Sequence, residues 1–307
     1  MILVTMGCSW TYGSGVGYDK NLHFTPDKYP AEMSEDEFKN IAGDDYPTYV
    51  DFLKNRTNKK FFKENVWKEL TEDLTSNIIG TKQFKKIAWN KKICDSFSFR
   101  GLLSKEYKIK NLNYSIGGSS NDEQFFHMEN IFGNPKTRKE FIKQKPIVLW
   151  GITSTGRIFR DKSYMLKPEY EADHIKDYIS SYLKLGFYNH KKSCKSISNK
   201  IEMWNIIFNH YNIPVIWFDT FNTHKYSSKL ENFLTGGDLL TQILKRYKLK
   251  FRSNSYHLSL WLNDDNRIQV GVENELLNPI SFHPTKKGHE AIKDILSPYI
   301  KSIIQGA

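Results

Sequence analysis

Residues 1–13, Met1-Ile2-Leu3-Val4-Thr5-Met6-Gly7-Cys8-Ser9-Trp10-Thr11-Tyr12-Gly13, join a short apolar run to a turn bounded by two glycines. A short apolar run that ends at a glycine is typical of a buried parallel strand. Gly7 permits a sharp turn, which leaves the Ser9 hydroxyl at the end of the strand. This stretch therefore predicts the first strand of an α/β sheet, with a serine at its carboxyl end.

Further strands and helices are predicted along the rest of the chain. The expected strands are 107–114, 146–150 and 214–218, and the expected helices are 83–103, 121–132, 196–211 and 286–304. Strands that alternate with helices form a parallel sheet covered on both faces, and functional residues collect at the carboxyl ends of its strands. We therefore expect one edge of the sheet to be formed by residues 7–13, 116–122, 151–157 and 219–223.

The simplest domain organisation is a single domain over residues 1–307, because no repeat, low-complexity tract or flexible linker divides the sequence. Residues 14–80 interrupt the alternating pattern with an irregular, polar and aromatic stretch, in which short helices are expected at 48–56 and 65–75. We interpret residues 14–80 as an insertion. Its position directly after Ser9 suggests a lid over the site.

Composition excludes several classes of protein. A hydrophobic fraction of 39% and an aromatic fraction of 14% argue against wholesale disorder. The cysteines, Cys8, Cys94 and Cys194, are too few and too widely spaced for a disulfide framework or a structural zinc site. The net charge of +11 permits contact with polyanions, but it is spread over short lysine clusters without a motif, which disfavours nucleic acid as the partner.

The hydropathy pattern bears on location. No stretch reaches the ~18 apolar residues that a membrane span needs. The apolar run at the N-terminus has no basic segment ahead of it, so we expect no signal peptide. These features predict a cytoplasmic or virion-associated protein without a membrane span.

Ser9 and His283 are the candidate nucleophile and base. A serine is activated only when a base lies beside it, and His283 lies on a loop stiffened by Pro284, just before the last expected helix. Each residue also has a purely structural interpretation, since Ser9 could cap the next segment and His283 could be an ordinary surface histidine. His289, inside the expected helix, is interpreted as structural.

Three blocks of the chain together resemble the SGNH, or GDSL-type, hydrolase superfamily. Residues 7–13 are similar to its first block, residues 113–122 (Asn-Tyr-Ser-Ile-Gly-Gly-Ser-Ser-Asn-Asp) to its second, and residues 282–289 (Phe-His-Pro-Thr-Lys-Lys-Gly-His) to its last. The blocks occur in the family's order, while residues 14–80 and 158–195 have no counterpart. The resemblance implies a three-layer α/β/α flavodoxin-like fold. It also implies hydrolysis of esters of lipids, acylated sugars or small acyl donors, with no metal or other cofactor.

The resemblance also implies a role for each matching residue. Ser9 is the expected nucleophile and His283 the expected general base, in acyl transfer through an acyl-enzyme. The expected oxyanion hole uses the backbone N–H groups of Ser9 and Gly118. The third block of the family normally adds an asparagine, which this sequence lacks, so the hydroxyl of Thr153 or Ser154 is expected to replace it.

Two further positions depart from the family pattern. Cys8 stands where the family usually has an aspartate, and we expect its side chain to point away from the site. Ile280 stands where an aspartate normally orients the histidine. A backbone carbonyl could orient His283 in a Ser–His dyad, or a carboxylate could come from elsewhere. The candidate carboxylates are Glu273, Glu275 and Asp219.

The first functional hypothesis is a serine esterase that acts on an acylated, above all O-acetylated, carbohydrate or on a small ester. Aromatic rings stack on sugars, and the expected site edge contains Trp10, Tyr12, Trp150 and Phe282, although these rings could equally belong to the core. Basic charge would favour an acidic polysaccharide. The candidate substrate contacts are Trp10, Tyr12, Asn121 and Arg157.

The alternative hypothesis is a catalytically inactive protein of the same fold, which binds glycans or has a structural role. The missing aspartate and asparagine favour this alternative. Sequences with Gly-Cys-Ser-Trp in the first block resemble proteins of bacteriophages and of bacterial surface-polysaccharide clusters, so a virion component is one form of it. The sequence does not predict an oligomeric state.

Overall fold

The computed structural model describes residues 1–13, 16, 91–160, 162–166, 173–221, 230–252, 266–277 and 282–306. The insertion predicted at 14–80 lies outside the described residues except for Val16, so its short helices and its role as a lid stay predictions. Among the helices of the described ranges, none is both long enough and apolar enough to cross a membrane.

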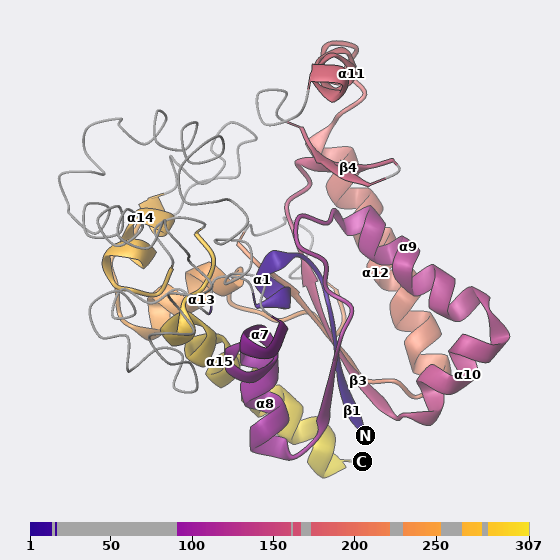
Figure 1. Ribbon diagram of the computed structural model, residues 1–307, viewed down its shortest axis with the longest axis vertical. Coiled ribbons are helices and arrows are strands. Elements are labelled where there is room, and N and C mark those ends of the chain that lie inside the picture. The colour runs from indigo at the N-terminus through magenta and orange to yellow at the C-terminus, as the bar shows by residue number, and fades with distance from the viewer. Residues whose placement is uncertain are drawn as a thin grey trace, which may run out of the picture.

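A parallel four-stranded sheet forms the centre of the molecule (Figure 1). Its strands are β1 (Ile2–Met6), β2 (Lys110–Asn113), β3 (Pro146–Ile152) and β6 (Val215–Asp219), in the spatial order β2-β1-β3-β6. All four strands lie where the sequence predicts them. The second is shorter than the expected 107–114 because helix α8 (Phe99–Tyr107) continues to Tyr107.

The two central strands are buried along their whole length. β1 pairs with β3 from Ile2 opposite Pro146 to Met6 opposite Trp150. Every residue of both strands is buried, which explains why their sequences are continuous apolar runs rather than alternating patterns. The predicted α/β fold with a central parallel sheet is thus confirmed.

Helices cover both faces of the sheet (Figure 1). One face carries α8, α13 (Leu239–Arg246), α14 (Asn266–Glu273) and α15 (Lys286–Gly306), and the other carries α9 (Asn121–Gly133), α10 (Pro135–Lys143) and α12 (His190–His210). Successive strand residues point to opposite faces, so Leu3 packs in the first layer while Val4 packs in the second.

Residues 83–90 of the helix expected over 83–103 lie outside the described residues, and the described remainder is divided. It contains α7 (Lys91–Phe97) and then α8, which starts at Phe99. Ser98 separates them because its backbone is extended, with φ of −72° and ψ of 162°. The expected helices at 121–132, 196–211 and 286–304 are confirmed as α9, α12 and α15, with α12 starting earlier than predicted.

Several elements of the structure were not predicted. An antiparallel hairpin of β4 (Arg157–Phe159) and β5 (Ser163–Met165) follows β3, and helix α11 (Asp173–Lys184) comes next. Figure 1 shows the hairpin and α11 beyond the carboxyl ends of β1 and β3. Their small apolar cluster includes Tyr164 and Ile179 and is separate from both main cores. Helices α13 and α14 were also missed.

Candidate active site

The strand order gives Ser9 a particular position at the carboxyl edge of the sheet. Along the chain the sheet grows from β1 to β2 on one side and then to β3 on the other. In α/β sheets, ligands bind at the carboxyl ends of the strands where the order reverses in this way. Ser9 follows β1 and Thr153 follows β3, so both lie at this point.

The turn that carries Ser9 depends on close backbone packing. Gly7 has φ of +136°, a conformation that L side chains rarely adopt. A Cβ at Gly7 would also lie 2.7 Å from the Gly151 carbonyl oxygen and would clash with the Thr11 hydroxyl. The chain then turns directly into the short helix α1 (Ser9–Tyr12), whose first residue is Ser9.

His283 is held by the segment on either side of it. Phe282 is buried in the core with φ of +55°, which is uncommon for a residue with a side chain. On the other side, Pro284 pairs with Leu277 in an isolated bridge. The Thr285 hydroxyl accepts a hydrogen bond from Gly288 N and donates one to the Glu275 carbonyl. The loop is therefore fixed against the start of α15.

Ser9 and His283 meet across nearly the whole length of the chain. The distance between Ser9 Oγ and His283 Nε2 is 2.6 Å, and the two residues are 274 positions apart. Ser9 is 5% exposed. A histidine at this distance can accept the serine proton, which is the first requirement for a serine nucleophile.

A hydrogen-bond network joins the Ser9 turn to the second block. Gln124 Oε1 accepts from Gly7 N at 2.9 Å, and Gln124 Nε2 donates to Ser119 Oγ at 3.0 Å. Ser119 Oγ in turn donates to the Gly7 carbonyl at 3.2 Å, and Ile116 N donates to the same carbonyl at 3.0 Å. The loop that contains Gly118 is thereby held against the turn that contains Ser9. Sequence analysis missed Gln124, since a single glutamine inside a helix carries no distinguishing pattern.

Gly118 and Thr153 are two of the expected oxyanion donors. Gly118 is exposed, has φ of +81° and has open space around the position of a Cβ. Thr153 N donates to Asn121 Oδ1 at 2.8 Å, so this amide is already engaged. The Thr153 hydroxyl is buried and has no hydrogen-bond partner among the described residues.

Asn121 holds the backbone at the end of β3. Its Nδ2 donates to the Thr153 carbonyl at 2.9 Å while its Oδ1 accepts from Thr153 N, so the amide holds the end of β3 by two hydrogen bonds. Asn121 is 6% exposed, and Ser120 rather than Asn121 caps α9 by accepting from Glu123 N. These bonds use the amide that was expected to contact substrate.

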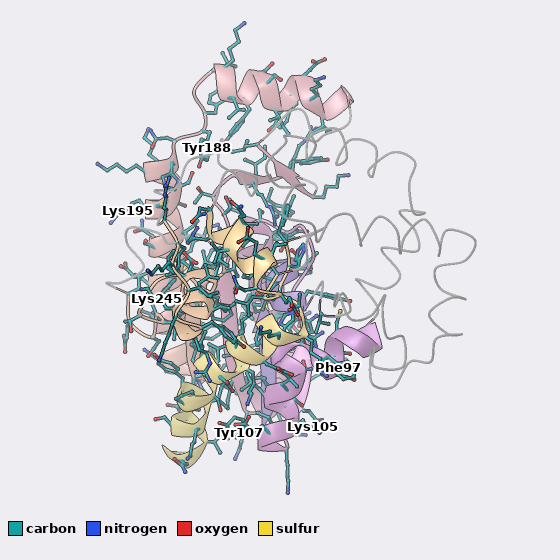
Figure 2. All side chains as sticks on the ribbon, turned by 90° about the vertical axis from the view of Figure 1, so that its left-hand side faces the viewer. Phe97, Lys105, Tyr107, Tyr188, Lys195 and Lys245 are labelled. Atoms are coloured by element: carbon teal, nitrogen blue, oxygen red, sulfur yellow. The ribbon has the colours of Figure 1, made fainter. Side chains whose placement is uncertain are left out.

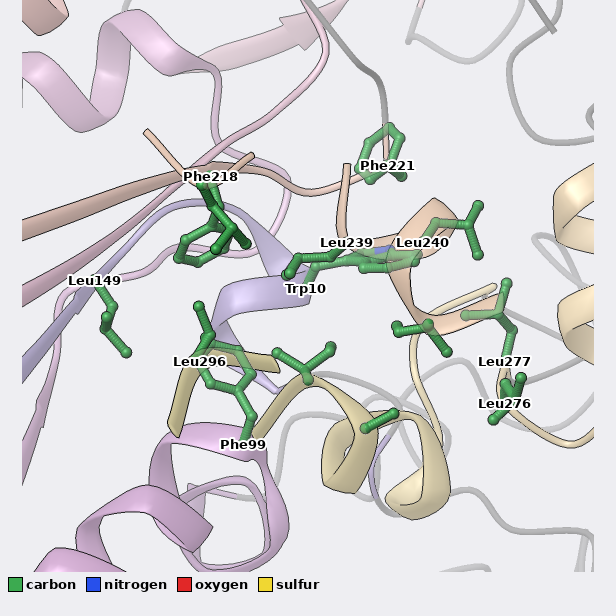
Figure 3. Close-up of a cluster of buried hydrophobic side chains, with 14 of the residues drawn as sticks. Trp10, Phe99, Leu149, Phe218, Phe221, Leu239, Leu240, Leu276, Leu277 and Leu296 are labelled. Carbon is green, nitrogen blue, oxygen red and sulfur yellow. The ribbon is translucent and has the colours of Figure 1, made fainter. Parts of the chain in front are cut away.

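The other three residues expected to contact the substrate are buried or half-buried. Trp10 is 3% exposed and packs in the core, with its ring 5.5 Å from that of Phe221 (Figure 3). Tyr12 is half-buried beside the Arg100 guanidinium. Arg157 is half-buried, and its Nη1 donates to the Ser119 carbonyl at 2.9 Å, which places a positive charge beside the Gly118 loop.

Trp150 and Phe282 are also core residues. Trp150 is fully buried against Trp217 on the face of the sheet away from Trp10. Phe282 belongs to the same apolar cluster as Trp10. The aromatic residues that the sequence assigns to the site edge are therefore mainly packing residues.

The three carboxylates proposed to orient His283 lie on two different segments of the chain. Asp219 is 2% exposed at the end of β6. Glu273 lies at the end of α14, where its Oε1 accepts from Gln269 Nε2 at 3.2 Å. Glu275 is half-buried and follows that helix. Ile280 and Ser281 lie outside the described residues, and the backbone carbonyl and the carboxylates stay the predicted alternatives for orienting His283.

Cys8 and His289 have structural surroundings, as expected. Cys8 is fully buried in the same apolar core as Trp10 and Phe282. His289 is fully buried and stacks on Phe99, whose backbone N donates to His289 Nδ1 at 3.4 Å. Burial, with smaller contributions from the charges of Arg100 and His283, lowers the pKa of His289 to about 3, so this imidazole is neutral at pH 7.

The described residues contain no group of three or more histidine, cysteine, aspartate or glutamate side chains that could hold a metal ion.

Comparison with known proteins assigns no family. No family model matches the chain, and no curated protein or solved structure matches it. The structure defines the class of fold, an α/β protein with a parallel sheet flanked by helices.

Proposed function

We propose that this protein is a serine esterase of the SGNH type that removes acyl groups, above all O-acetyl groups, from carbohydrate. The observation that carries the proposal is the 2.6 Å distance between Ser9 Oγ and His283 Nε2. Ser9 and His283 come from opposite ends of the sequence, and the predicted chemistry requires a contact between them. A chance contact between two such residues would be unusual.

The fold supports this proposal. Numbered along the chain, the sheet order is second, first, third, fourth, which is the order found in flavodoxin-like folds. Ser9 and His283 lie at the edge where such folds bind ligands. These are similarities of architecture, and a fold by itself does not determine an activity.

The proposed reaction proceeds in two steps. His283 Nε2 takes the proton of Ser9 Oγ as the oxygen attacks the ester carbonyl carbon, and then passes that proton to the departing sugar hydroxyl. The resulting acyl-enzyme is attacked by water, whose proton goes to His283. When the tetrahedral intermediate collapses, the acid leaves and Ser9 regains its proton.

The charge that develops on the carbonyl oxygen needs donors. We assign this role to the backbone N–H groups of Ser9 and Gly118, with the buried Thr153 hydroxyl as a third donor. The network through Gln124 and Ser119 supports this assignment because it holds the Gly118 loop against the Ser9 turn. One such donor typically contributes about 10²–10³ in rate.

Labelling with a fluorophosphonate probe tests the proposal without knowledge of the substrate. We expect labelling at Ser9, mapped by mass spectrometry, and its loss in Ser9→Ala. His283→Ala should reduce the labelling rate by about 10³-fold or more, because no base then takes the serine proton.

Two variants serve as matched controls. Ser302→Ala and His210→Ala remove exposed residues on α15 and α12, and both should label like the wild-type protein. Circular dichroism establishes that each variant is folded. After labelling, acetate release from O-acetylated polysaccharides identifies the substrate.

The alternative is a catalytically inactive protein of the same fold that binds glycans or has a structural role, for example in a virion. Ile280 and Thr153 favour it, since they replace the aspartate and asparagine that the family normally uses. A folded wild-type protein that takes up no probe at Ser9 would contradict the esterase and support this alternative.

A further inference from the structure

We propose that the β4–β5 hairpin, α11 and the exposed side of α9 form an aromatic platform that binds an anionic polysaccharide and leads it to the Ser9 site. The platform consists of Phe126, Phe159, Tyr178, Tyr182 and Phe187. Its role in feeding the site rests on the proposed esterase activity, whereas its binding of polysaccharide can be measured separately.

The rings of the platform form a chain of contacts across three elements. Phe126 of α9 lies 5.5 Å from Phe159 of β4, measured between ring centroids. Tyr178 of α11 lies 6.2 Å from Tyr182, which lies 5.6 Å from Phe187. Arg160 connects the two groups: it follows Phe159 in sequence, and its guanidinium carbon lies 5.3 Å from the centre of the Tyr178 ring.

Three of the five platform rings are exposed, while Phe159 and Tyr182 are half-buried. The exposed fractions are 48% for Phe126, 38% for Tyr178 and 65% for Phe187. Clusters of exposed apolar side chains are uncommon on protein surfaces and mark interaction sites. A sugar ring has a face of C–H groups that can pack on an aromatic ring while its hydroxyl groups stay in water.

One cation, Arg160, lies over a ring of the platform, and a second, Lys162, lies on the same hairpin over the buried Tyr164. Arg160 and Lys162 are both exposed, and the Lys162 ammonium lies 5.3 Å from the centre of the Tyr164 ring. A guanidinium pairs well with a carboxylate, as in a uronic acid, and the net charge of +11 attracts a polyanion from a distance. Rings together with exposed cations therefore favour an acidic glycan over a neutral one.

The platform is joined to the Gly118 loop through both strands of the hairpin. Arg157 Nη1 of β4 donates to the Ser119 carbonyl at 2.9 Å, and Ser120 N donates to Ser163 Oγ of β5 at 2.6 Å. Ser163 Oγ also donates to Glu123 Oε2 at 2.5 Å. A chain bound on the platform would thus lie beside the loop that is expected to stabilise the oxyanion.

Helix α11 and the hairpin lie at one end of the molecule. Figure 1 shows α11 beyond the hairpin on the side of the carboxyl ends of β1 and β3, and Figure 2 shows Tyr188 below α11 with Phe97 and Tyr107 toward the opposite end. None of the five platform rings belongs to the two main apolar cores of the described residues.

The test measures binding of the full chain to immobilised polygalacturonate, with dextran as the neutral comparison, at 0.15 M salt to screen long-range attraction. We expect polygalacturonate to bind and dextran to bind more weakly. Replacing Phe126, Tyr178 and Phe187 together by alanine should weaken binding by about tenfold or more, because stacking contacts are lost while the charge is unchanged.

Tyr299→Ala is the matched control, because Tyr299 is an exposed aromatic residue on α15, at 42%, away from the platform. It should bind like the wild-type protein. The single variant Phe187→Ala removes the most exposed ring and should lose part of the affinity for polygalacturonate. It replaces the triple variant in this test if the triple variant does not fold.

Apart from a lack of polygalacturonate binding, three results would overturn the proposal. Undiminished binding by the folded ring variants would mean that charge alone holds the polymer. Equal binding of dextran would remove the preference for an anionic chain. Tighter binding of double-stranded DNA, with a steep dependence on salt, would point to nucleic acid instead.

Failure of the platform and failure of the esterase give different results. A fluorophosphonate is small and should not need the platform, so the ring variants should label at Ser9 like the wild-type protein. Intact labelling with no polygalacturonate binding contradicts the platform alone. Ring-dependent binding without any labelling contradicts the esterase and leaves the binding site standing.

Discussion

Gly7 determines the geometry of the Ser9 turn more directly than any neighbouring residue. Its left-handed backbone lets the chain leave β1 and enter α1 at once, and its missing side chain lets the turn approach Gly151 and Thr11. Its N–H and carbonyl also hold the Gly118 loop through Gln124 and Ser119. One residue without a side chain thereby positions both the candidate nucleophile and a candidate oxyanion donor.

Gly7→Ala should lower the free energy of unfolding by at least about 2 kcal/mol, because both the backbone conformation and the Cβ position are unfavourable for alanine. Urea denaturation measures the change. Gly133→Ala is the control, since Gly133 has open space around the position of a Cβ and no left-handed backbone. An equal effect in the two variants would contradict this account of the turn.

At the scale of elements, the site depends on how α9 docks against the ends of β1 and β3. Gln124 of α9 bonds to the Ser9 turn, while Asn121 of the same helix bonds to both backbone groups of Thr153. Both side chains are buried, so each hydrogen bond replaces one that water would otherwise supply. The first turn of α9 therefore connects the carboxyl ends of β1 and β3, beyond the last residues that pair in the sheet.

Gln124→Met should cost about 1–3 kcal/mol of stability, because it keeps the shape of the side chain but leaves Gly7 N–H buried without its acceptor. We also expect slower fluorophosphonate labelling of Ser9, since the turn loses its link to the Gly118 loop. Labelling kinetics and urea denaturation measure the two effects. Slower labelling is the informative result, because a role limited to stability would leave the labelling rate of the folded protein unchanged.

Gln144→Met is the matched control for this substitution. Gln144 is exposed, and its amide donates to the carbonyl of Glu140 one turn earlier in the chain. Its replacement should change stability by less than about 0.5 kcal/mol.

For the whole molecule, the packing of α8 against α15 makes stability sensitive to acid. His289 lies between these helices with its ring on Phe99, and burial is the main reason that its pKa falls from 6.5 to about 3. In the unfolded chain the imidazole takes up a proton near its ordinary pKa. Between about pH 6 and pH 3 the unfolded state therefore holds one more proton than the folded state at this residue.

This difference predicts that His289 contributes a loss of up to ~1.4 kcal/mol in the free energy of unfolding for each pH unit of acidification within that window. His289→Gln should remove that contribution, so its stability should fall less steeply from pH 6 to pH 4. Urea denaturation at several pH values measures the slope. The exposed His127→Gln should keep the wild-type slope, and an unchanged slope in His289→Gln would show that another group takes up the proton.

The sequence alone determined the parallel sheet, the order of its main elements and the pairing of Ser9 with His283 as a hypothesis. Apolar runs ended by glycines are local signals, and the carboxyl ends of parallel strands meet at one edge whatever the details of packing. The positions of the strands could therefore be predicted from the sequence. The expected topology in turn predicted that Ser9 and His283 lie close together.

Only the tertiary structure decided which polar and aromatic side chains face the site, the core or the solvent. It places Trp10 and Trp150 in the core, engages Asn121 with Thr153, and exposes Phe126 and its neighbouring rings on a hairpin that was not predicted. The physical reason is that burial and hydrogen bonding depend on which surfaces pack together, and residues distant in sequence supply those surfaces.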